Sequence, residues 1–237
     1  MKLIGLKKEG KGVSVQFYGC QLRCPYCTHI MQPMMEKEVQ EVLEFIANPK
    51  VEEVYLGGAE PTVQKKELLE LLQRLSRMNR RVTLKTNGMD PELLHQTLNL
   101  VNRYIIEVKC ALDDIECNSQ LTGLGREATG KYLKALWKSL EVIRGKDVRV
   151  WIRIIPGFMD QDRMAKIGRQ ISGVATEAFL MQFLALPENE RPFAKVKEPG
   201  PNESEMVALA RVLLEYVPNV FVRGKEFRAD FRSGNRA

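Results

Sequence analysis

The sequence predicts an α/β fold in which parallel strands form a partial, TIM-like (β/α)6 barrel. Short runs rich in β-branched residues alternate with longer amphipathic stretches, and this alternation repeats six times. Alternating strands and helices give a parallel sheet with right-handed crossovers. Six units are fewer than the eight of a closed barrel, which favours an incomplete barrel. With 44% hydrophobic residues among 237, the chain can bury a sizeable core.

The expected strands are the β-branched and aromatic runs at 13–18, 54–56, 82–86, 104–109, 148–155 and 179–184. The expected helices carry apolar residues at helical spacing and cover 35–47, 63–78, 91–102, 127–143, 162–176 and 204–216. Pro91 follows Asp90 and suits the first turn of a helix, and Asn202 or Ser204 can cap the last helix. Residues 219–222 are expected to add a short final strand.

We expect one domain over residues 1–237, with a core at about 13–186 and a C-terminal loop, helix and basic tail at 187–237. The first residues are too short an apolar stretch for a signal peptide, and charges interrupt every apolar run before the roughly 18 residues that a membrane span needs. A soluble, cytoplasmic protein is therefore expected. The loop at 187–201, rich in Pro, Glu and Lys, is long enough to be a functional lid.

The formal net charge of +6 is concentrated in part at the C-terminal end. A solvated tail is the favoured interpretation of this basic segment, because only two aromatic residues, Phe227 and Phe231, accompany it and both can pack onto the body. We therefore do not expect a nucleic acid partner. The basic residues are Arg223, Lys225, Arg228, Arg232 and Arg236.

Three cysteines, Cys20, Cys24 and Cys27, form a C-x3-C-x2-C motif directly after the first expected strand. Three thiolates bind three irons of a 4Fe-4S cluster and leave the fourth iron open to a small chelating molecule, which indicates catalysis. A cluster for electron transfer alone usually has a fourth cysteine, and neither Cys110 nor Cys117 has local spacing that suggests this role. An odd total of five cysteines also fits a ligand cluster in a reducing cytosol better than disulfides.

Zinc is the alternative occupant of this motif. His29 would be the fourth ligand in C-x3-C-x2-C-x-H, and zinc accepts mixed cysteine and histidine sites. Cys110 and Cys117 are interpreted as small apolar core residues, because free cysteine is often buried.

The cysteine motif, with Tyr26 directly before its last cysteine, resembles that of the radical S-adenosylmethionine superfamily and, within it, of the activating enzymes of glycyl-radical proteins. The resemblance runs from about residue 13 to residue 157 and implies that the Tyr26 ring packs near the cofactor's adenine. It also includes Gly57-Gly58-Ala59-Glu60-Pro61, similar to the family's Gly-Gly-Glu-Pro stretch, whose backbone receives the cofactor's amino group. The chain departs from that pattern at Ala59, where the family has glycine.

Two further segments are similar to the family. Thr86-Asn87-Gly88 resembles its Thr-Asn-Gly segment, whose polar side chains approach the sugar or methionine part of the cofactor. Glu107-Val108-Lys109 resembles the Asp-x-Lys pair of the activating enzymes, with both charges on one face of a strand. The resemblance implies that Lys109 meets the cofactor's carboxylate, and a buried structural ion pair is the alternative.

The segments at 121–123 and 151–157 resemble the Thr-Gly and Arg-x-x-x-Pro-Gly segments of the activating enzymes. Arg153 either contacts the cofactor or an acidic group, or is a structural arginine inside the sheet. Beyond residue 187 the match fades, and a histidine that several activating enzymes carry after strand six is missing.

The resemblance implies an oxidoreductase that uses a 4Fe-4S cluster and S-adenosyl-L-methionine to form a 5'-deoxyadenosyl radical, with no protein residue as acid, base or nucleophile. The expected partners are a glycyl-radical enzyme, either an anaerobic ribonucleotide reductase or a formate-lyase-like enzyme, and an electron donor such as ferredoxin or flavodoxin. Two alternatives stay open: a radical enzyme that modifies a small molecule, peptide or RNA, and a non-catalytic iron-sulfur or zinc-binding module.

Overall fold

The computed structural model describes residues 1–29, 32–184 and 200–234. Its strands are β1 (Lys2–Glu9), β2 (Gly12–Phe17), β3 (Met35–Glu36), β4 (Glu53–Gly58), β5 (Arg81–Thr86), β6 (Arg103–Glu107), β7 (Asp147–Ile154), β8 (Glu177–Gln182), β9 (Asn219–Arg223) and β10 (Arg228–Arg232). Its helices are α1 (Val39–Ile46), η2 (Pro61–Val63), α2 (Lys65–Arg77), α3 (Pro91–Thr97), α4 (Ile115–Thr122), α5 (Arg126–Val142), α6 (Gln161–Ile171) and α7 (Glu203–Leu213).

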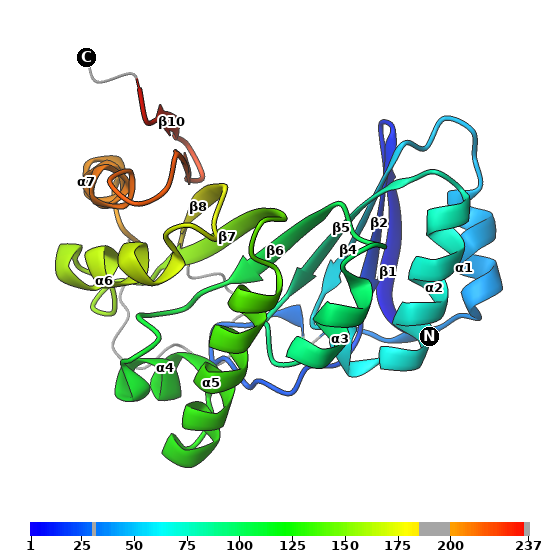
Figure 1. Ribbon diagram of the computed structural model, residues 1–237, viewed down its shortest axis with the longest axis horizontal. Coiled ribbons are helices and arrows are strands. Elements are labelled where there is room, and N and C mark those ends of the chain that lie inside the picture. Colours follow the sequence, from blue (N-terminus) through cyan, green and yellow to red (C-terminus); the bar gives the residue numbers. More distant parts are fainter. Residues whose placement is uncertain (30–31, 185–199, 235–237) are drawn as a thin grey trace.

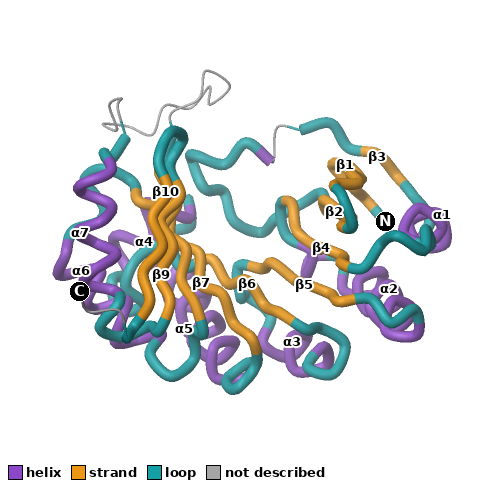
Figure 2. Tube along the Cα trace, turned by 90° about the horizontal axis from the view of Figure 1, so that it is seen from above, coloured by secondary structure: helices purple, strands orange, loops and turns teal. Residues whose placement is uncertain are grey.

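The described strands form one sheet that does not close on itself. Within the described residues the order is β10-β9-β8-β7-β6-β5-β4-β2-β1-β3, so that β10 and β3 are the two edges. Every pairing from β2 through β4 to β9 is parallel, whereas β1 pairs antiparallel with β2 and β3, and β10 pairs antiparallel with β9. The strands follow an arc with the helices along its outer side (Figures 1 and 2). The predicted partial barrel of parallel strands is confirmed.

Alternation along the strands explains the two faces of the arc. In β7, Val148, Val150, Ile152 and Ile154 are buried, while the residues between them are only partly buried and include Arg153. Apolar faces of the helices complete the core; α2, for example, buries four leucines. The inner face of the arc therefore receives the polar and charged side chains.

Six expected strands and the final strand at 219–222 correspond to β2, β4, β5, β6, β7, β8 and β9. The two predicted helix starts are also found: Asp90 caps α3 before Pro91, and Asn202 caps α7 through a capping box. The expected helix at 35–47 begins only at Val39, because the preceding Met35–Glu36 pairs with β1.

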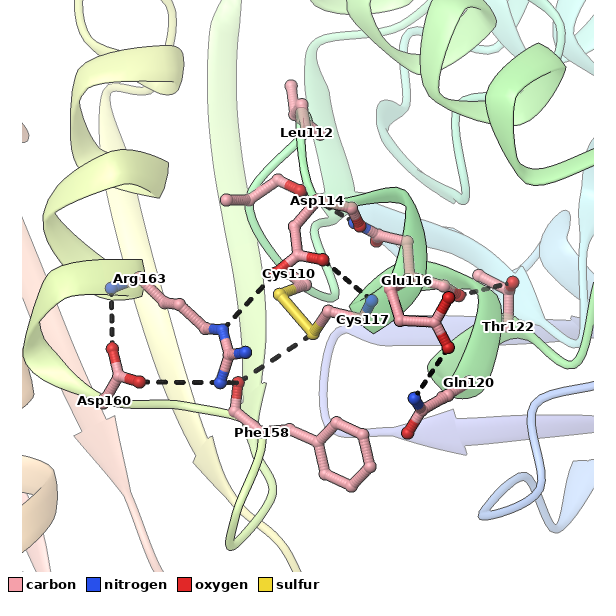
Figure 3. Close-up of a disulfide and its surroundings, with 12 residues drawn as sticks. Cys110, Leu112, Asp114, Glu116, Cys117, Gln120, Thr122, Phe158, Asp160 and Arg163 are labelled. Carbon is pink, nitrogen blue, oxygen red and sulfur yellow. Dashed lines mark hydrogen bonds and ion pairs between the residues drawn. A yellow bond between two sulfur atoms is a disulfide. The ribbon is translucent and has the colours of Figure 1, made fainter. Parts of the chain in front are cut away.

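The expectation that Cys110 and Cys117 are unpaired is wrong, although both are buried as predicted. They form a disulfide with their Cα atoms 6.3 Å apart (Figure 3). The reason is α4, which the sequence did not indicate. Asp114 caps this helix by accepting from the Cys117 amide, and the turn brings the first turn of α4 back to the end of β6.

The loop expected at 187–201 lies outside the described residues except for its last two, and Arg236 also lies outside them. In the described part of the chain, no helix combines the length and apolarity needed to cross a lipid bilayer.

Candidate active site

A cavity of about 250 Å³ opens at the carboxyl ends of the parallel strands. Its lining residues come from six separate stretches of sequence. The carboxyl ends of the strands are the usual place for a site in a β/α barrel. Nearly all of the predicted site residues line it, namely Cys20, Cys24, Tyr26, Cys27, Gly58, Ala59, Glu60, Thr86, Asn87, Glu107, Lys109 and Arg153. The remaining predicted site residue, Gly57, lies one residue before the C-terminal end of β4 and does not line the cavity.

Backbone contacts fix the loop that carries the three cysteines. The Arg23 amide donates to the Thr122 carbonyl at 2.9 Å, and the Cys27 amide donates to the Cys24 carbonyl at 3.0 Å. Gly123, with a φ of +69°, lies so close to the Arg23 carbonyl that a side chain there would overlap it. The loop is therefore anchored on the end of α4, and all three of its cysteines are free thiols facing one cavity.

Cys20 and Cys24 lie in surroundings that disfavour bare thiolates. Burial raises the pKa of the Cys20 thiol to about 12, and the nearby Glu60 carboxylate adds to this rise. Burial likewise raises the pKa of Cys24, although the charge of Lys109 opposes it. Three thiolates at this position therefore need a cationic group among them, which is the donor chemistry of an iron-sulfur or zinc site.

Glu60 connects the carboxyl ends of β4 and β5. Its Oε1 accepts from the Thr62 hydroxyl at 2.7 Å, the Thr62 amide at 3.2 Å and the Thr86 hydroxyl at 2.7 Å, and its Oε2 accepts from the Asn87 amide at 2.7 Å. Burial raises the pKa of Glu60, while these four donors lower it. The Glu60 carboxylate and the Thr86 hydroxyl thus hold the cavity wall in shape, which is a role that the resemblance did not indicate.

Asn87 links this wall to the cysteine loop. Its side-chain amide donates to Gln21 Oε1 at 3.2 Å and lies 3.8 Å from Cys20 Sγ. Gly58, just before Ala59, has a φ of +99° and a backbone packed against Phe17. Glycine is required there because a β carbon would lie 2.6 Å from the Phe17 nitrogen.

The expected charged pair is present, but β6 ends at Glu107, so Lys109 lies just beyond the strand and not on it as predicted. Lys109 Nζ donates to Glu107 Oε1 at 3.0 Å and to the Tyr26 hydroxyl at 3.2 Å. Burial alone would raise the pKa of Glu107, but Lys109, Lys85 and Arg153 together hold it well below its usual value. Burial lowers the pKa of Lys109, and the negative charges of Cys24 and Glu107 more than reverse this, so that its pKa lies well above the ordinary value.

Lys85, His29 and Phe183 also line the cavity. Of these three, only His29 was considered from the sequence, as the fourth ligand of the zinc alternative. Lys85 is 3.6 Å from Glu107 and lies two residues before Asn87, so strand alternation could have placed it on the inner face. The His29 ring nitrogen Nδ1 is 3.9 Å from Cys27 Sγ, which agrees with the geometry that the zinc alternative requires. Phe183 packs edge-on against Tyr26, and no local pattern in the sequence predicts this contact.

Residues 15–167 match the model of the Radical SAM superfamily. This chain belongs to the radical SAM superfamily. It is 27% identical to a candidate glycyl-radical enzyme activating enzyme of Methanocaldococcus jannaschii. This match extends over 231 residues, which are 94% of this chain and 92% of that relative. A 7-carboxy-7-deazaguanine synthase of Hyperthermus butylicus is 36% identical over 83 residues, or 33% of this chain and 35% of that protein.

Solved radical SAM structures share the fold. TYW1 with a lysine-pyruvate adduct superposes with a TM-score of 0.66 at 15% identity, over 95% of this chain and 81% of TYW1. SuiB of Streptococcus suis bound to S-adenosylmethionine gives a TM-score of 0.66 at 16% identity, over 88% of this chain and 49% of SuiB. As a member of the superfamily, the protein uses a 4Fe-4S cluster and S-adenosylmethionine. Three free thiols in one cavity, one buried and two partly buried, lie beside a buried ammonium group and fit these two groups.

Proposed function

We propose that Cys20, Cys24 and Cys27 hold the cluster and that the protein activates a glycyl-radical enzyme by removing a hydrogen atom from one of its glycines. When bound, the cluster and S-adenosylmethionine supply the reductive cleavage that yields methionine and a 5'-deoxyadenosyl radical. The observation that carries the proposal is the convergence of all three motif thiols on a cavity shared with Lys109 and the glycine turn before Glu60. A zinc or electron-carrier module has no need of these additional groups.

In this proposal the chain binds and orients the cofactor. The Lys109 ammonium group, 4% exposed, receives the carboxylate of S-adenosylmethionine, and the backbone around Gly58 and Ala59 receives its amino group. Tyr26 offers a ring face to the adenine, with the Arg153 guanidinium 6.0 Å from the ring centre. Burial of these groups keeps water and other reactants away from the radical.

Two relatives support a protein substrate. Besides the relative at 27% identity, a second candidate glycyl-radical enzyme activating enzyme of M. jannaschii is 22% identical over 214 residues, covering 88% of this chain and 79% of its own. The described strands also form an open sheet with two edges, an arrangement that suits a macromolecular substrate better than a closed barrel does. A low-potential donor such as ferredoxin or flavodoxin would supply the electron.

The first test is cofactor cleavage after anaerobic reconstitution with iron and sulfide. With dithionite and S-adenosylmethionine, we expect 5'-deoxyadenosine from the wild type and none from Cys24→Ser. A Cys110→Ser/Cys117→Ser double variant is the matched control, because it also removes buried sulfur atoms but leaves the motif intact. If the wild type with a complete cluster gives no 5'-deoxyadenosine, the radical chemistry is refuted for this chain.

The second test addresses the substrate. Incubation with an anaerobic ribonucleotide reductase or a formate-lyase-like enzyme should produce a glycyl radical signal in electron paramagnetic resonance. Deuterium on the α carbon of the partner's glycines should then appear in 5'-deoxyadenosine. Replacement of the partner's reactive glycine by alanine is the control, and it should abolish both signals.

A small-molecule reaction is the second candidate. Its support is the match to 7-carboxy-7-deazaguanine synthases, which reaches 38% identity for the Clostridium acetobutylicum enzyme but covers only 35% of this chain. Formation of 7-carboxy-7-deazaguanine from the substrate of those enzymes, with no glycyl radical on either protein partner, would favour this candidate over the activating function.

A further inference from the structure

The disulfide between Cys110 and Cys117 lies outside the cysteine motif and has no role in the proposed chemistry. Cys110 directly follows Lys109 at the exit of β6, and Cys117 lies in the first turn of α4. Both residues are almost completely buried, with exposed fractions of 0% and 4%. Figure 3 shows the sulfur-sulfur bond between the end of β6 and this helix.

The pair lies behind the wall of the active-site cavity. Cys110 and Cys117 belong to a small apolar cluster with Leu121, Ile155 and Phe183, against which Tyr26 and Phe158 pack. Tyr26 and Phe183 also line the cavity. One layer of side chains therefore separates the pair from the cavity.

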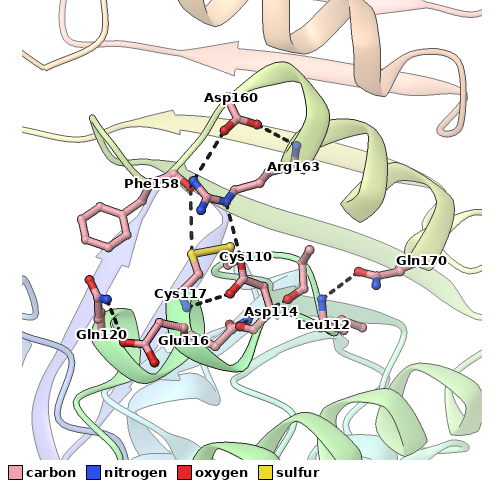
Figure 4. Close-up of polar contacts among 12 residues, drawn as sticks. Cys110, Leu112, Asp114, Glu116, Cys117, Gln120, Phe158, Asp160, Arg163 and Gln170 are labelled. Carbon is pink, nitrogen blue, oxygen red and sulfur yellow. Dashed lines mark hydrogen bonds and ion pairs between the residues drawn. A yellow bond between two sulfur atoms is a disulfide. The ribbon is translucent and has the colours of Figure 1, made fainter. Parts of the chain in front are cut away.

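The helix that carries Cys117 also holds the cysteine loop. At the C-terminal end of α4, the Thr122 carbonyl accepts from the Arg23 amide, in the middle of the motif. At its N-terminal end, Asp114 accepts from the Cys117 amide at 2.9 Å and lies 3.5 Å from Arg163 of α6 (Figure 4). The disulfide thus cross-links the segment after β6, directly next to Lys109, to the helix that anchors the cysteine loop.

We propose that Cys110 and Cys117 are a reversible dithiol–disulfide site, which closes on exposure to peroxide and stabilises the cysteine loop when the cluster is absent. One thiol attacks hydrogen peroxide, giving a sulfenic acid and water, and the other attacks the sulfenic sulfur, forming the disulfide and a second water. A dithiol reverses the reaction by exchange and is itself oxidised to a disulfide. Peroxide is small enough to reach a buried pair.

The oxidised state has two consequences. It fixes the β6–α4 turn, and through the Arg23–Thr122 contact it restrains the motif loop. It also withdraws two thiols that could otherwise pair with the three free ones of the motif. The redox site rests on this chain's own geometry, whereas its benefit to an iron-sulfur cluster rests on the proposed function.

The test uses the cluster-free, full-length protein, so that its result does not depend on radical chemistry. Under denaturing alkylation, the reduced wild type should show all five cysteines free. After peroxide it should show three, with Cys110 and Cys117 joined in the mapped peptide, and dithiothreitol should restore five. Cys20→Ser is the matched control and should still lose two thiols to the same pair.

Trypsin cleavage after Arg23, which is exposed, reports on the loop itself. We expect cleavage there to be about fivefold slower in the oxidised than in the reduced wild type, and unaffected by peroxide in Cys110→Ser/Cys117→Ser. Equal cleavage rates in the two states would overturn the link to the loop. Five thiols that persist after peroxide, or a chelator-sensitive metal ion that protects Cys110 and Cys117, would overturn the redox site.

Discussion

Replacement of Glu60 by glutamine tests which effect on stability is larger at the cavity wall, the four hydrogen bonds that its carboxylate accepts or the cost of burying its charge. Glu60 is 1% exposed, and its Oε1 accepts three hydrogen bonds while its Oε2 accepts one, from the Asn87 amide. The amide of Glu60→Gln would keep its oxygen where the three donors meet. The NH2 group of the new glutamine side chain then faces the backbone N–H of Asn87, so that two buried hydrogen-bond donors point at one another.

The expected loss follows from this mismatch. A hydrogen bond to a charged acceptor contributes roughly 1.5–3 kcal/mol, and removal of a buried carboxylate returns part of this through a smaller desolvation penalty. We expect Glu60→Gln to lower the free energy of unfolding by about 2 kcal/mol, which is about 4–8 °C in Tm for a chain of this length.

Urea unfolding of the cluster-free protein, followed by circular dichroism, measures this difference directly. Thr62→Val is the matched control, because it removes one hydroxyl donor and keeps the carboxylate; we expect a loss of about 1 kcal/mol. If Glu60→Gln unfolds at the same urea concentration as the wild type or at a higher one, the reasoning is refuted. The burial that raises the pKa of Glu60 would then outweigh its four donors.

Three further predictions concern the same cavity. Because the pKa of Glu107 is depressed, its charge stabilises the fold above about pH 4, and this contribution is lost as the pH falls further. The difference in unfolding free energy between wild type and Glu107→Gln should therefore become smaller from pH 7 to pH 3. A difference that stays constant over this range would contradict the prediction. Gly58→Ala should destabilise the protein by about 3 kcal/mol because of its positive φ and the contact with Phe17, whereas Gly130→Ala, with open space around it, should not destabilise it. Lys109→Met should weaken S-adenosylmethionine binding, measured by calorimetry on reconstituted protein, about tenfold or more, and an unchanged Kd would remove Lys109 from the proposed carboxylate contact.

The parallel sheet could be predicted because its signal is local. Each strand of the core is a short β-branched run, and each is followed by a helix with one apolar face, so the order along the chain determines the order in space. The strand β1 was not predicted because Lys2–Glu9 ends in charged residues and belongs to no β/α unit, since it pairs antiparallel with β2 and β3. Helix α4 has eight residues and a weakly apolar face, so its existence depends on the Asp114 cap and on tertiary packing.

For the site, the motifs identified which residues gather but not what each one contacts. The three cysteines and the Glu107–Lys109 pair are local patterns, and the structure brings both to one cavity. The partners of Glu60 lie up to 27 residues away, and no spacing rule connects a carboxylate to them. The disulfide at Cys110 depends in the same way on a turn that only tertiary packing defines.

The cysteine loop is attached to α4 by main-chain atoms, and this has a consequence for its evolution. The Arg23 amide and the Thr122 carbonyl are present whatever side chain each position carries, with proline at position 23 as the exception. This main-chain hydrogen bond can therefore survive substitution at the exposed position 23, whereas Thr122 is fully buried and leaves room only for a side chain of similar size, and glycine has to stay at position 123. Anchoring of this kind allows a loop geometry to persist in descendants whose surrounding residues have almost all been replaced.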